Sequence, residues 1–270
     1  MNKKCDLHVH SNFSDSDADV ESIFRLASQK GLSCIALTDH DTVAGIPQAK
    51  ISSKKYNVEL VEAIELSAQH KDSEVHILGY FINTQNKKLQ AELKNIEDFR
   101  RKRIMVMLEK LNSLGMKLDR DEFEAKIDKA IPTRLHLALH LVEKKKAKSL
   151  PEVFRKYLAP GRPAYASCFE HSAEETIRLI KDCGGLSFIA HPHAISSQAW
   201  IEEFIALGVN GLEVTYPGMS QAKSLIYRNM AKKFNLLLSG GSDYHGSYKA
   251  FNDLGIVNVP YEWVEDMKKR

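Results

Sequence analysis

Cysteine is scarce in this sequence, and the few cysteines that occur are widely spaced. The 270 residues include Cys5, Cys34, Cys168 and Cys183, and no two of them form a CxxC pair. This distribution predicts buried, reduced thiols and argues against a disulfide framework or a zinc ribbon. Any metal bound by this chain should therefore have histidine and carboxylate ligands.

Long hydrophobic runs are also missing. No apolar stretch approaches the roughly 18 residues that a membrane span needs, and the start of the chain, MNKKCDLHVH, contains no hydrophobic signal segment. A content of 43% hydrophobic and 27% charged residues is ordinary for a globular enzyme. We therefore expect a cytoplasmic protein that does not contact a membrane, and the sequence indicates no obligate protein partner.

Several catalytic and cofactor motifs are absent. The sequence has no GxSxG elbow for a serine nucleophile, no GxGxxG fingerprint and no P-loop. A nucleotide would therefore be a substrate, not a bound dinucleotide cofactor. Ser242, which directly precedes Asp243, is better explained as part of a metal-ligand loop than as a nucleophile.

Charge is divided unevenly along the chain, although the net charge is only +3. Residues 84–163 contain 20 lysines and arginines against 11 acids, which makes this segment +9 and the remainder −6. A basic segment beside an acidic body suggests a polyanionic or phosphorylated ligand held between the two. A solvated helical surface rich in lysine is the alternative explanation.

Short apolar runs alternate with segments of helical period near both ends of the chain. Examples are KCDLHVH followed by ADVESIFRLASQKG, and NGLEVTY followed by MSQAKSLIYRNMAKKF. The alternation predicts an α/β fold in which crossover helices join parallel strands. Several apolar runs end at a histidine or an acid, and because catalytic residues gather at the carboxyl ends of barrel strands, their convergence favours a barrel over an open sheet.

The alternation stops between residues 84 and 163. Apolar side chains from Leu89 to Leu111 recur at helical spacing, with Gly115 as a possible stop. The stretches DRDEFEAKIDKA, TRLHLALHLVEKK and SLPEVFRKYL predict further helices. We therefore expect a barrel domain made of residues 1–83 and 164–270, with residues 84–163 inserted as a small helical domain.

The stretch DLHVHSNFSD places His8 and His10 two residues apart and follows them with Asp15. Residues i and i+2 of a strand point to the same face, so both imidazoles can reach one point, as metal ligands must. One such pair would be weak evidence, because paired histidines also occur on surfaces and in cores. The candidate ligands at strand ends are more numerous, and are His8, His10, Asp15, His40, Glu65, His76, His191, Asp243 and His245.

Six stretches, taken in order, resemble the motifs of the PHP (polymerase and histidinol phosphatase) family. They are DLHVHSNFSDSD, ALTDHDTVAGI, EAIELSA, EVHILGYF, GGLSFIAHPH and SGGSDYHG, and they span nearly the whole chain. The helical segment also resembles that of a stand-alone bacterial branch. Members of that branch act as 3′,5′-nucleoside bisphosphate phosphatases and, in some cases, as 5′-to-3′ exonucleases on short RNA.

The resemblance implies a distorted barrel of seven β/α units that binds two or three divalent ions. One ion would be held by His8, His10, Glu65 and Asp243, a second by Glu65, His76 and His191, and a third by Asp15, His40 and His245. Adjacent ions lower the pKa of a shared water and neutralise phosphoryl oxygens, so water can attack phosphorus in line without a covalent intermediate. Manganese is the first expectation by resemblance, with iron, zinc and magnesium also compatible with these ligands.

The resemblance further implies which residues act on the substrate. Glu65, His191, Asp243 and Arg134 would form the catalytic group. Arg134 and His136, which match an Arg-x-His pattern of the branch, would contact the substrate, and His193 is expected there as a further contact that is not part of the pattern. Arg134 suits a phosphate because a guanidinium gives paired, charge-assisted hydrogen bonds, although an exposed helix start is an alternative explanation for Arg134 and His136. His193 departs from the pattern of the branch, which usually has a small residue there. The case for Arg162 as a substrate residue is weaker still, because the stretch PGRPAY that contains it is also a typical turn.

Other polar residues have simpler explanations. Asp39 and Asp41, on either side of His40, could orient imidazoles or cap a helix. Glu213 could face the barrel mouth or be a buried acid hydrogen-bonded to its neighbours, and it is not among the predicted site residues. The remaining histidines are expected on the surface or with satisfied hydrogen bonds, and are His70, His140 and His171.

The leading hypothesis is a metal-dependent phosphohydrolase whose substrate is a small phosphorylated nucleotide or a short oligoribonucleotide. A histidinol-phosphate phosphatase is the alternative within the same family, and an amidohydrolase is more distant because no bridging lysine is evident. A non-catalytic module that binds metal or nucleic acid is the alternative outside enzymes. Lost ligands would be the signature of such a module, and none of the nine candidates is missing.

Overall fold

The computed structural model describes residues 3–71, 73–127, 130–166, 171–195, 197–249 and 253–270. Its strands are β1 Lys4–Val9, β2 Leu32–Leu37, β3 Glu59–His70, β4 Ser73–Tyr80, β5 Leu186–Ile189, β6 Gly211–Thr215, β7 Leu237–Gly240 and β8 Val259–Pro260. Its helices are α1 Val20–Gln29, α2 Ile46–Tyr56, α3 Lys87–Ser113, α4 Arg120–Ile127, α5 Arg134–Glu143, α6 Leu150–Val153, α7 Ala173–Asp182, α8 Gln198–Ala206, α9 Gln221–Lys233 and α10 Glu262–Lys268. Short turns of other helical types cover Phe154–Leu158, Pro192–Ala194 and Gly246–Tyr248.

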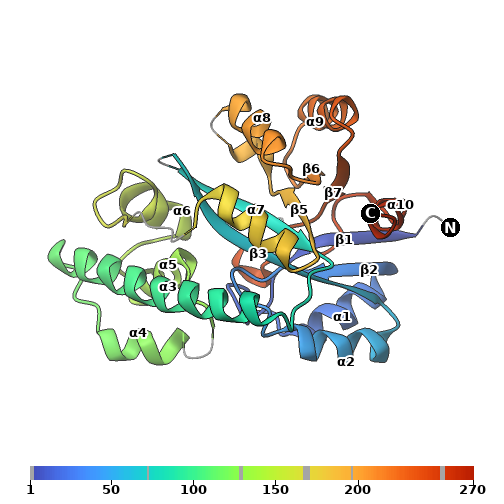
Figure 1. The fold of residues 1–270 in the computed structure, drawn as a ribbon. Coiled ribbons are helices and arrows are strands. Elements are labelled where there is room, and N and C mark those ends of the chain that lie inside the picture. The colour runs from blue at the N-terminus through green and yellow to red at the C-terminus, as the bar shows by residue number, and fades with distance from the viewer. Residues whose placement is uncertain (1–2, 72, 128–129, 167–170, 196, 250–252) are drawn as a thin grey trace.

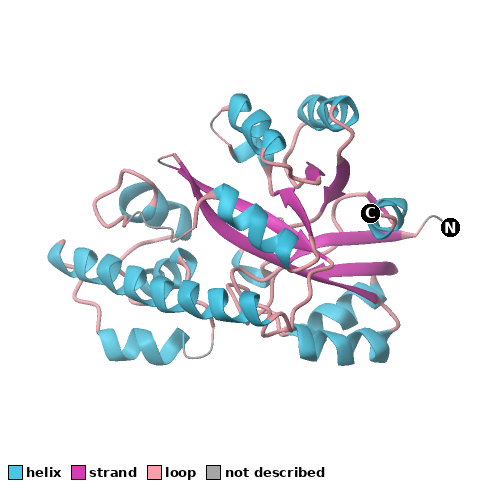
Figure 2. Ribbon diagram, in the orientation of Figure 1, coloured by secondary structure: helices cyan, strands magenta, loops and turns pink. Residues whose placement is uncertain are grey.

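The strands form one sheet in the order β7-β6-β5-β4-β3-β2-β1-β8. Strands β1 to β3 are parallel, as are β5 to β7, while β4 runs antiparallel to both of its neighbours. The sheet curls until Tyr244, just after β7, bridges Val9 at the end of β1, so the barrel is nearly closed. Figures 1 and 2 show helices packed around this curled sheet. The predicted α/β fold, a distorted barrel with inserted helices, is confirmed.

Local sequence explains the helices that cover the barrel. In α1, Val20, Ile23, Phe24 and Ala27 recur at helical spacing and are all buried. Asp19 caps this helix, because its carboxylate accepts a hydrogen bond from the Ser22 backbone N–H. The helix therefore begins at a capping residue and packs its apolar face on the sheet.

Helix α3 joins two hydrophobic clusters. Its first half, with Leu89, Leu93 and Ile96, packs in the core of the barrel. Its second half, from Ile104 to Leu111, packs in a separate cluster built from the inserted helices, which lie together on the left of Figure 1. Gly115 follows the helix end with a φ of 86°, in agreement with the predicted stop. The inserted segment thus has its own core but shares α3 with the barrel, and the division at residue 84 stays a prediction.

Arg100 lies on α3 between the two clusters and reaches into the barrel. Its Nε donates to Asp41 Oδ2 at 2.5 Å, and its Nη2 donates to Ser67 Oγ at 2.6 Å. Its Nη1 donates to the Pro132 carbonyl in the insert at 3.2 Å. Asp41 also accepts a hydrogen bond from the Ser67 N–H at 2.8 Å. Its carboxylate therefore anchors Arg100 to the barrel, which differs from the helix cap and from the imidazole partner considered for it.

Two further expectations concern the cysteines and membrane spans. Cys5, Cys34 and Cys183 are buried and free, as predicted, whereas Cys168 lies outside the described residues. In the described part of the chain, no helix combines the length and apolar character that a membrane span requires.

We predict that Arg100→Met destabilises the protein strongly, because it leaves the fully buried carboxylate of Asp41 without its cation. Removing one partner of a buried ion pair costs about 3–5 kcal/mol. Urea unfolding should show this loss, and the double variant Arg100→Met/Asp41→Asn should recover part of it. Arg120→Met, which removes an exposed arginine of the insert, serves as control. An Arg100→Met variant as stable as this control would contradict the docking role.

Candidate metal centre

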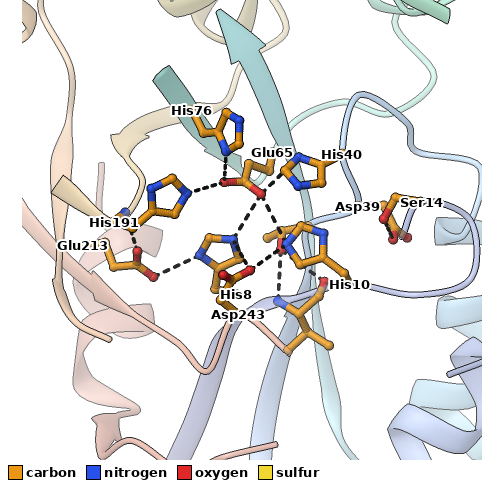
Figure 3. A network of polar contacts seen from close by, with 12 residues as sticks. His8, His10, Ser14, Asp39, His40, Glu65, His76, His191, Glu213 and Asp243 are labelled. Atoms are coloured by element: carbon orange, nitrogen blue, oxygen red, sulfur yellow. Dashed lines mark hydrogen bonds and ion pairs between the residues drawn. The ribbon is translucent and has the colours of Figure 1, made fainter. Parts of the chain in front are cut away.

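The nine predicted ligands converge at one end of the barrel. Figure 3 labels all of them except Asp15 and His245. His8 lies on β1 and His10 just after it, so their two-residue spacing puts both rings on one side of the strand. The others lie on or just after further strands, and are Asp15 and His40 in loops, Glu65 on β3, His76 on β4, His191 after β5, and Asp243 and His245 after β7. The convergence that the sequence predicted is present in the fold.

Glu65 is at the middle of this cluster and is only 1% exposed. Its Oε2 lies 3.2 Å from the Nε2 atoms of both His8 and His10, and 3.3 Å from His40 Nδ1. Its Oε1 lies 3.0 Å from His76 Nδ1 and 3.0 Å from His191 Nε2. One carboxylate therefore contacts five imidazoles, an arrangement in which each of its oxygens could serve a different ion.

The ligand atoms form three overlapping groups within which all atoms lie no more than 4.8 Å apart. The first contains His8, His10, Glu65 and Asp243, the four residues predicted for one ion. The second joins His10 to the predicted trio of Asp15, His40 and His245. The third contains His40, Glu65 and His76; His191 is not in it but contacts the same Glu65 oxygen as His76.

Unpaired buried atoms test whether these residues fit metal ions. Within the described part of the chain, five atoms of the predicted ligands are buried without a hydrogen-bond partner: His8 Nε2, His10 Nδ1, His10 Nε2, Asp15 Oδ1 and His40 Nδ1. Lone pairs that are buried and point at a common centre need a cation, because an unpaired buried polar atom is costly. Nitrogen and carboxylate oxygen together suit borderline and hard divalent ions, so the residues fit such ions.

The charges in the cluster reinforce one another. Burial raises the pKa of Glu65, but the nearby His40, His8 and His76 outweigh it, so its pKa falls well below the usual value. Burial lowers the pKa of His10, yet the carboxylates of Asp243 and Glu65, each 3.2 Å from its Nε2, raise it to about 9. For His76 the same competition, dominated by Glu65 once burial is overcome, raises the pKa to about 10. Without an ion, protons on the imidazoles balance the carboxylates.

Glu213 is a site residue that the sequence reasoning left out. Its Oε1 accepts from His8 Nδ1 at 3.0 Å, which leaves His8 Nε2 directed at the cluster. Its Oε2 accepts from the His191 backbone N–H at 2.6 Å. Such a partner fixes the tautomer and the direction of a ligand imidazole. The sequence carries no signal for this role, because an acid that alternates with Leu212 and Val214 along a strand is equally typical of a position that faces water.

Two more buried acids hold the loops that present the ligands. Asp39 accepts hydrogen bonds from the Ser11 N–H at 2.7 Å and the Ser14 hydroxyl at 2.6 Å, and so orders the loop that carries Asp15. Asp6 accepts from the Ser242 N–H at 2.8 Å, directly before Asp243. Of the two roles foreseen for Asp39, helix cap or orienting group, the contacts correspond to an orienting group that acts through a loop.

The second oxygen of Asp243 faces away from the first ligand group. Asp243 Oδ2 accepts from the Tyr216 hydroxyl at 2.6 Å and from Lys249 Nζ at 2.6 Å. Asp243 Oδ1 lies 3.2 Å from His10 Nε2. The carboxylate is thus oriented with one oxygen toward the imidazoles and the other toward two donors.

A cavity of about 640 Å³ opens from the cluster toward the insert. Asp15, His40, His76 and His245 line its polar floor. Glu74, Thr133 and Ser247 also line it, and the rest of the lining is basic or apolar, with Arg100, Arg103, Arg134, Lys249, Ile104, Pro132, Leu135, Leu150, Pro151, Phe154 and Tyr248. The cavity therefore has a metal-competent floor and a lining that is otherwise mainly basic and apolar.

The three predicted substrate residues differ in their positions. Arg134 lines the cavity, and its Nη2 lies 2.8 Å from Glu74 Oε2. His136 lines a different pocket, and its Nδ1 accepts from the Thr133 N–H at 3.1 Å as part of a helix cap. His193 packs on Tyr216, with ring centroids 4.6 Å apart, and is absent from the lining of the cavity. Of the three, Arg134 lines this cavity, whereas His193 lies beside the ligand His191, with ring centroids 6.5 Å apart.

The other histidines have partners away from the cluster, with one exception. His70 lies 2.7 Å from Glu203, and His171 lies 3.3 Å from Glu92. His140 is fully buried in the insert, and within the described residues neither of its ring nitrogens has a hydrogen-bond partner. The expectation of a surface or satisfied histidine is therefore wrong for His140, because the apolar packing around α5 covers it.

Comparison with known proteins places this geometry in a family. The sequence model of the PHP domain matches residues 6–161. A 5′-3′ exoribonuclease of Haemophilus influenzae is 32% identical over 91% of each chain. A 3′,5′-nucleoside bisphosphate phosphatase of Chromobacterium violaceum is 31% identical over 93% of this chain and 90% of its own. A Bifidobacterium adolescentis structure described as a metal-dependent phosphoesterase superposes with a TM-score of 0.90 at 27% identity, covering 98% of this chain and 95% of that one.

We predict that the ion-free protein loses stability as the pH rises from about 6.5 to about 10. The folded state holds protons on His10 and His76 with pKa values of about 9 and about 10, against 6.5 for free imidazole. Their contribution is complete below pH 6.5 and is lost as the pH rises through these values, on the order of a few kcal/mol in total. The lowered pKa of His40 acts only below pH 6.5, so it does not oppose this trend.

Urea unfolding of chelator-treated protein at several pH values measures this effect. The decline should shrink in a His10→Asn/His76→Asn variant. It should also shrink when manganese is added, because metal binding requires neutral imidazoles. A stability that is flat or rises over this range would contradict the assigned charge balance.

Proposed function

The chain belongs to the PHP domain family and is a metal-dependent phosphoesterase, and we propose that it removes the 3′-phosphate of 3′,5′-bisphosphonucleotides, acts on the 5′ ends of short RNA, or both. The observation that carries this proposal is the cavity, whose floor is the ligand cluster and whose walls are basic and apolar. In a bound nucleotide, the phosphate would contact the ligand cluster and the basic wall, and the sugar and base would contact the apolar wall.

The proposed ion sites follow the ligand groups. His8, His10, Glu65 and Asp243 would hold one ion, Glu65, His76 and His191 a second, and Asp15, His40 and His245 a third. Manganese is the first choice, and iron, zinc and magnesium remain compatible with the same donors. When bound, such ions supply an activated water and neutralise the charge on phosphoryl oxygens.

The protein's own side chains would orient the substrate. Arg134 borders the cavity and can donate two parallel hydrogen bonds to a phosphate, while Lys249 adds a second cation beside Asp243. Glu65, His191 and Asp243 stay in their proposed catalytic roles as ligands that fix the reacting centre. His136 and His193 stay predictions as substrate residues, although their contacts favour a helix cap for His136 and aromatic packing for His193.

The apolar part of the cavity lining favours a nucleotide as substrate over a small alcohol phosphate. Leu150, Pro151 and Phe154 of the insert offer an apolar wall that a nucleobase can cover. We propose that residues 84–163 form a cap over the barrel mouth and supply this apolar wall. Histidinol phosphate has a smaller ring and would leave much of this wall uncovered. A non-catalytic binding module is disfavoured because all nine ligand positions are occupied by competent residues.

We predict that the protein releases phosphate from 3′,5′-bisphosphoadenosine, or mononucleotides from short 5′-phosphorylated RNA, faster than it releases phosphate from histidinol phosphate. The assay should compare manganese, iron, zinc and magnesium added to chelator-treated protein. Glu65→Ala should abolish turnover, because it removes the one carboxylate that contacts five of the ligands.

Glu62→Ala, on the same strand but paired with Lys50 outside the cluster, is the matched control and should retain activity. Preference for histidinol phosphate would reject the nucleotide proposal. Undiminished turnover in Glu65→Ala would reject the bridging role of Glu65.

Arg134→Gln should weaken substrate binding while leaving the ion sites intact. A hydrogen bond to a charged group contributes about 1.5–3 kcal/mol, so KM for the preferred nucleotide should rise about 10- to 100-fold. Arg120→Gln, an exposed arginine of the same inserted segment, is the control for a general loss of positive charge. Equal KM values for the two variants would remove Arg134 from the substrate site.

A further inference from the structure

Glu74 lies between the proposed ion sites and the basic wall of the cavity. It precedes His76 by two residues on β4, so both side chains are on the same face of the strand. Glu74 Oε1 lies 3.2 Å from His76 Nε2, while its Oε2 lies 2.8 Å from Arg134 Nη2 and 3.6 Å from Arg103 Nη2. The side chain is 11% exposed, so these interactions are shielded from water.

The contact with His76 fixes the direction of a proposed ligand. His76 Nδ1 faces Glu65 Oε1 at 3.0 Å, and a carboxylate on the opposite side of the ring can only accept a hydrogen bond. Nε2 therefore keeps its proton when an ion takes the place of the Nδ1 proton, and the Nδ1 lone pair is directed at the ion. Removing such a partner typically costs 10- to 100-fold in metal affinity.

The contact with the arginines fixes the opposite wall. Arg103 comes from α3 and Arg134 from the start of α5, yet both guanidinium groups lie 5.7 Å from the centre of the Tyr165 ring. Arg103 Nε is further held by the Ala166 carbonyl at 2.9 Å. Two neighbouring guanidinium groups repel each other, and the Glu74 carboxylate, which lies within 4 Å of both, offsets this repulsion.

We propose that Glu74 is a positioning residue that ties ion binding to phosphate binding. Through one oxygen it orients His76 toward an ion, and through the other it holds the arginine pair Arg103 and Arg134 at the cavity wall. This inference rests on the proposed function of the cavity as a phosphoester site. It adds Arg103 to the groups that face the substrate and gives both arginines a common support.

A Glu74→Gln variant tests the proposal, because an amide keeps the shape but cannot accept hydrogen bonds through both ends. Its NH₂ group must face either the His76 N–H or a guanidinium, and both are donors. We expect the dissociation constant for manganese, measured by calorimetry on chelator-treated protein, to rise about 10-fold or more. We expect the dissociation constant for inorganic phosphate, measured on manganese-loaded protein, to rise about 10-fold as well.

Single variants at the two ends separate the contributions. Arg134→Gln should weaken phosphate binding with little change in manganese binding, and His76→Asn should weaken manganese binding directly. Glu203→Gln is the matched control, since Glu203 also bridges a histidine and a cation, with His70 Nε2 and Lys71 Nζ each at 2.7 Å, but does so on the outside of the barrel. Glu74→Asp, which keeps the charge, should retain more of both affinities than Glu74→Gln.

A merely structural role for Glu74 would lower the melting temperature without moving either binding constant, and this outcome would overturn the proposal. A change in only one of the two constants would overturn the coupling. Neither measurement uses turnover, so a wild-type protein that fails to cleave nucleotides would reject the proposed function while the two constants still decide the role of Glu74.

Discussion

A carboxylate buried among five imidazoles is the constraint that shapes this end of the barrel. Glu65 is almost completely shielded from water, and an isolated charge in that position would be prohibitively costly. The rings that neutralise it come from strands that are far apart in the chain, so the sheet must curl until they meet. The backbone bridge between Val9 and Tyr244 completes this curl, since it brings the strand of His8 and His10 beside the loop of Asp243.

Backbone strain collects around the same point. Asp41, His191 and Asp243 are non-glycine residues with φ values of 51°, 29° and 51°. Such conformations cost on the order of 1–3 kcal/mol each and persist where surrounding contacts dictate them. Here the contacts are buried acids: Glu213 holds the His191 N–H, and Asp6 holds the N–H of Ser242. The acids behind the ligands thus stabilise the geometry of the ligands themselves.

The sequence predicts the ligands better than their supports for a physical reason. His8, His10 and His191 follow apolar strands, so strand periodicity and strand ends are enough to group them. Glu213 and Glu74 also lie on strands, but an acid in a strand has the same appearance whether it supports a ligand or faces water. His136 is expected at the substrate by resemblance alone, and its contact with Thr133 in the cap of α5 is a feature that the structure adds.

The positive charge of residues 84–163 has more than one use. Arg100 joins the inserted segment to the barrel, because its charge is paired with Asp41 inside the barrel. Arg103 and Arg134 share the carboxylate of Glu74, which offsets part of their positive charge at the cavity wall. Lysines such as Lys145 are exposed and fit the simpler explanation of a solvated surface. The case for an anionic substrate therefore rests on the few cations that line the cavity, and the excess of basic residues over the whole segment adds little to it.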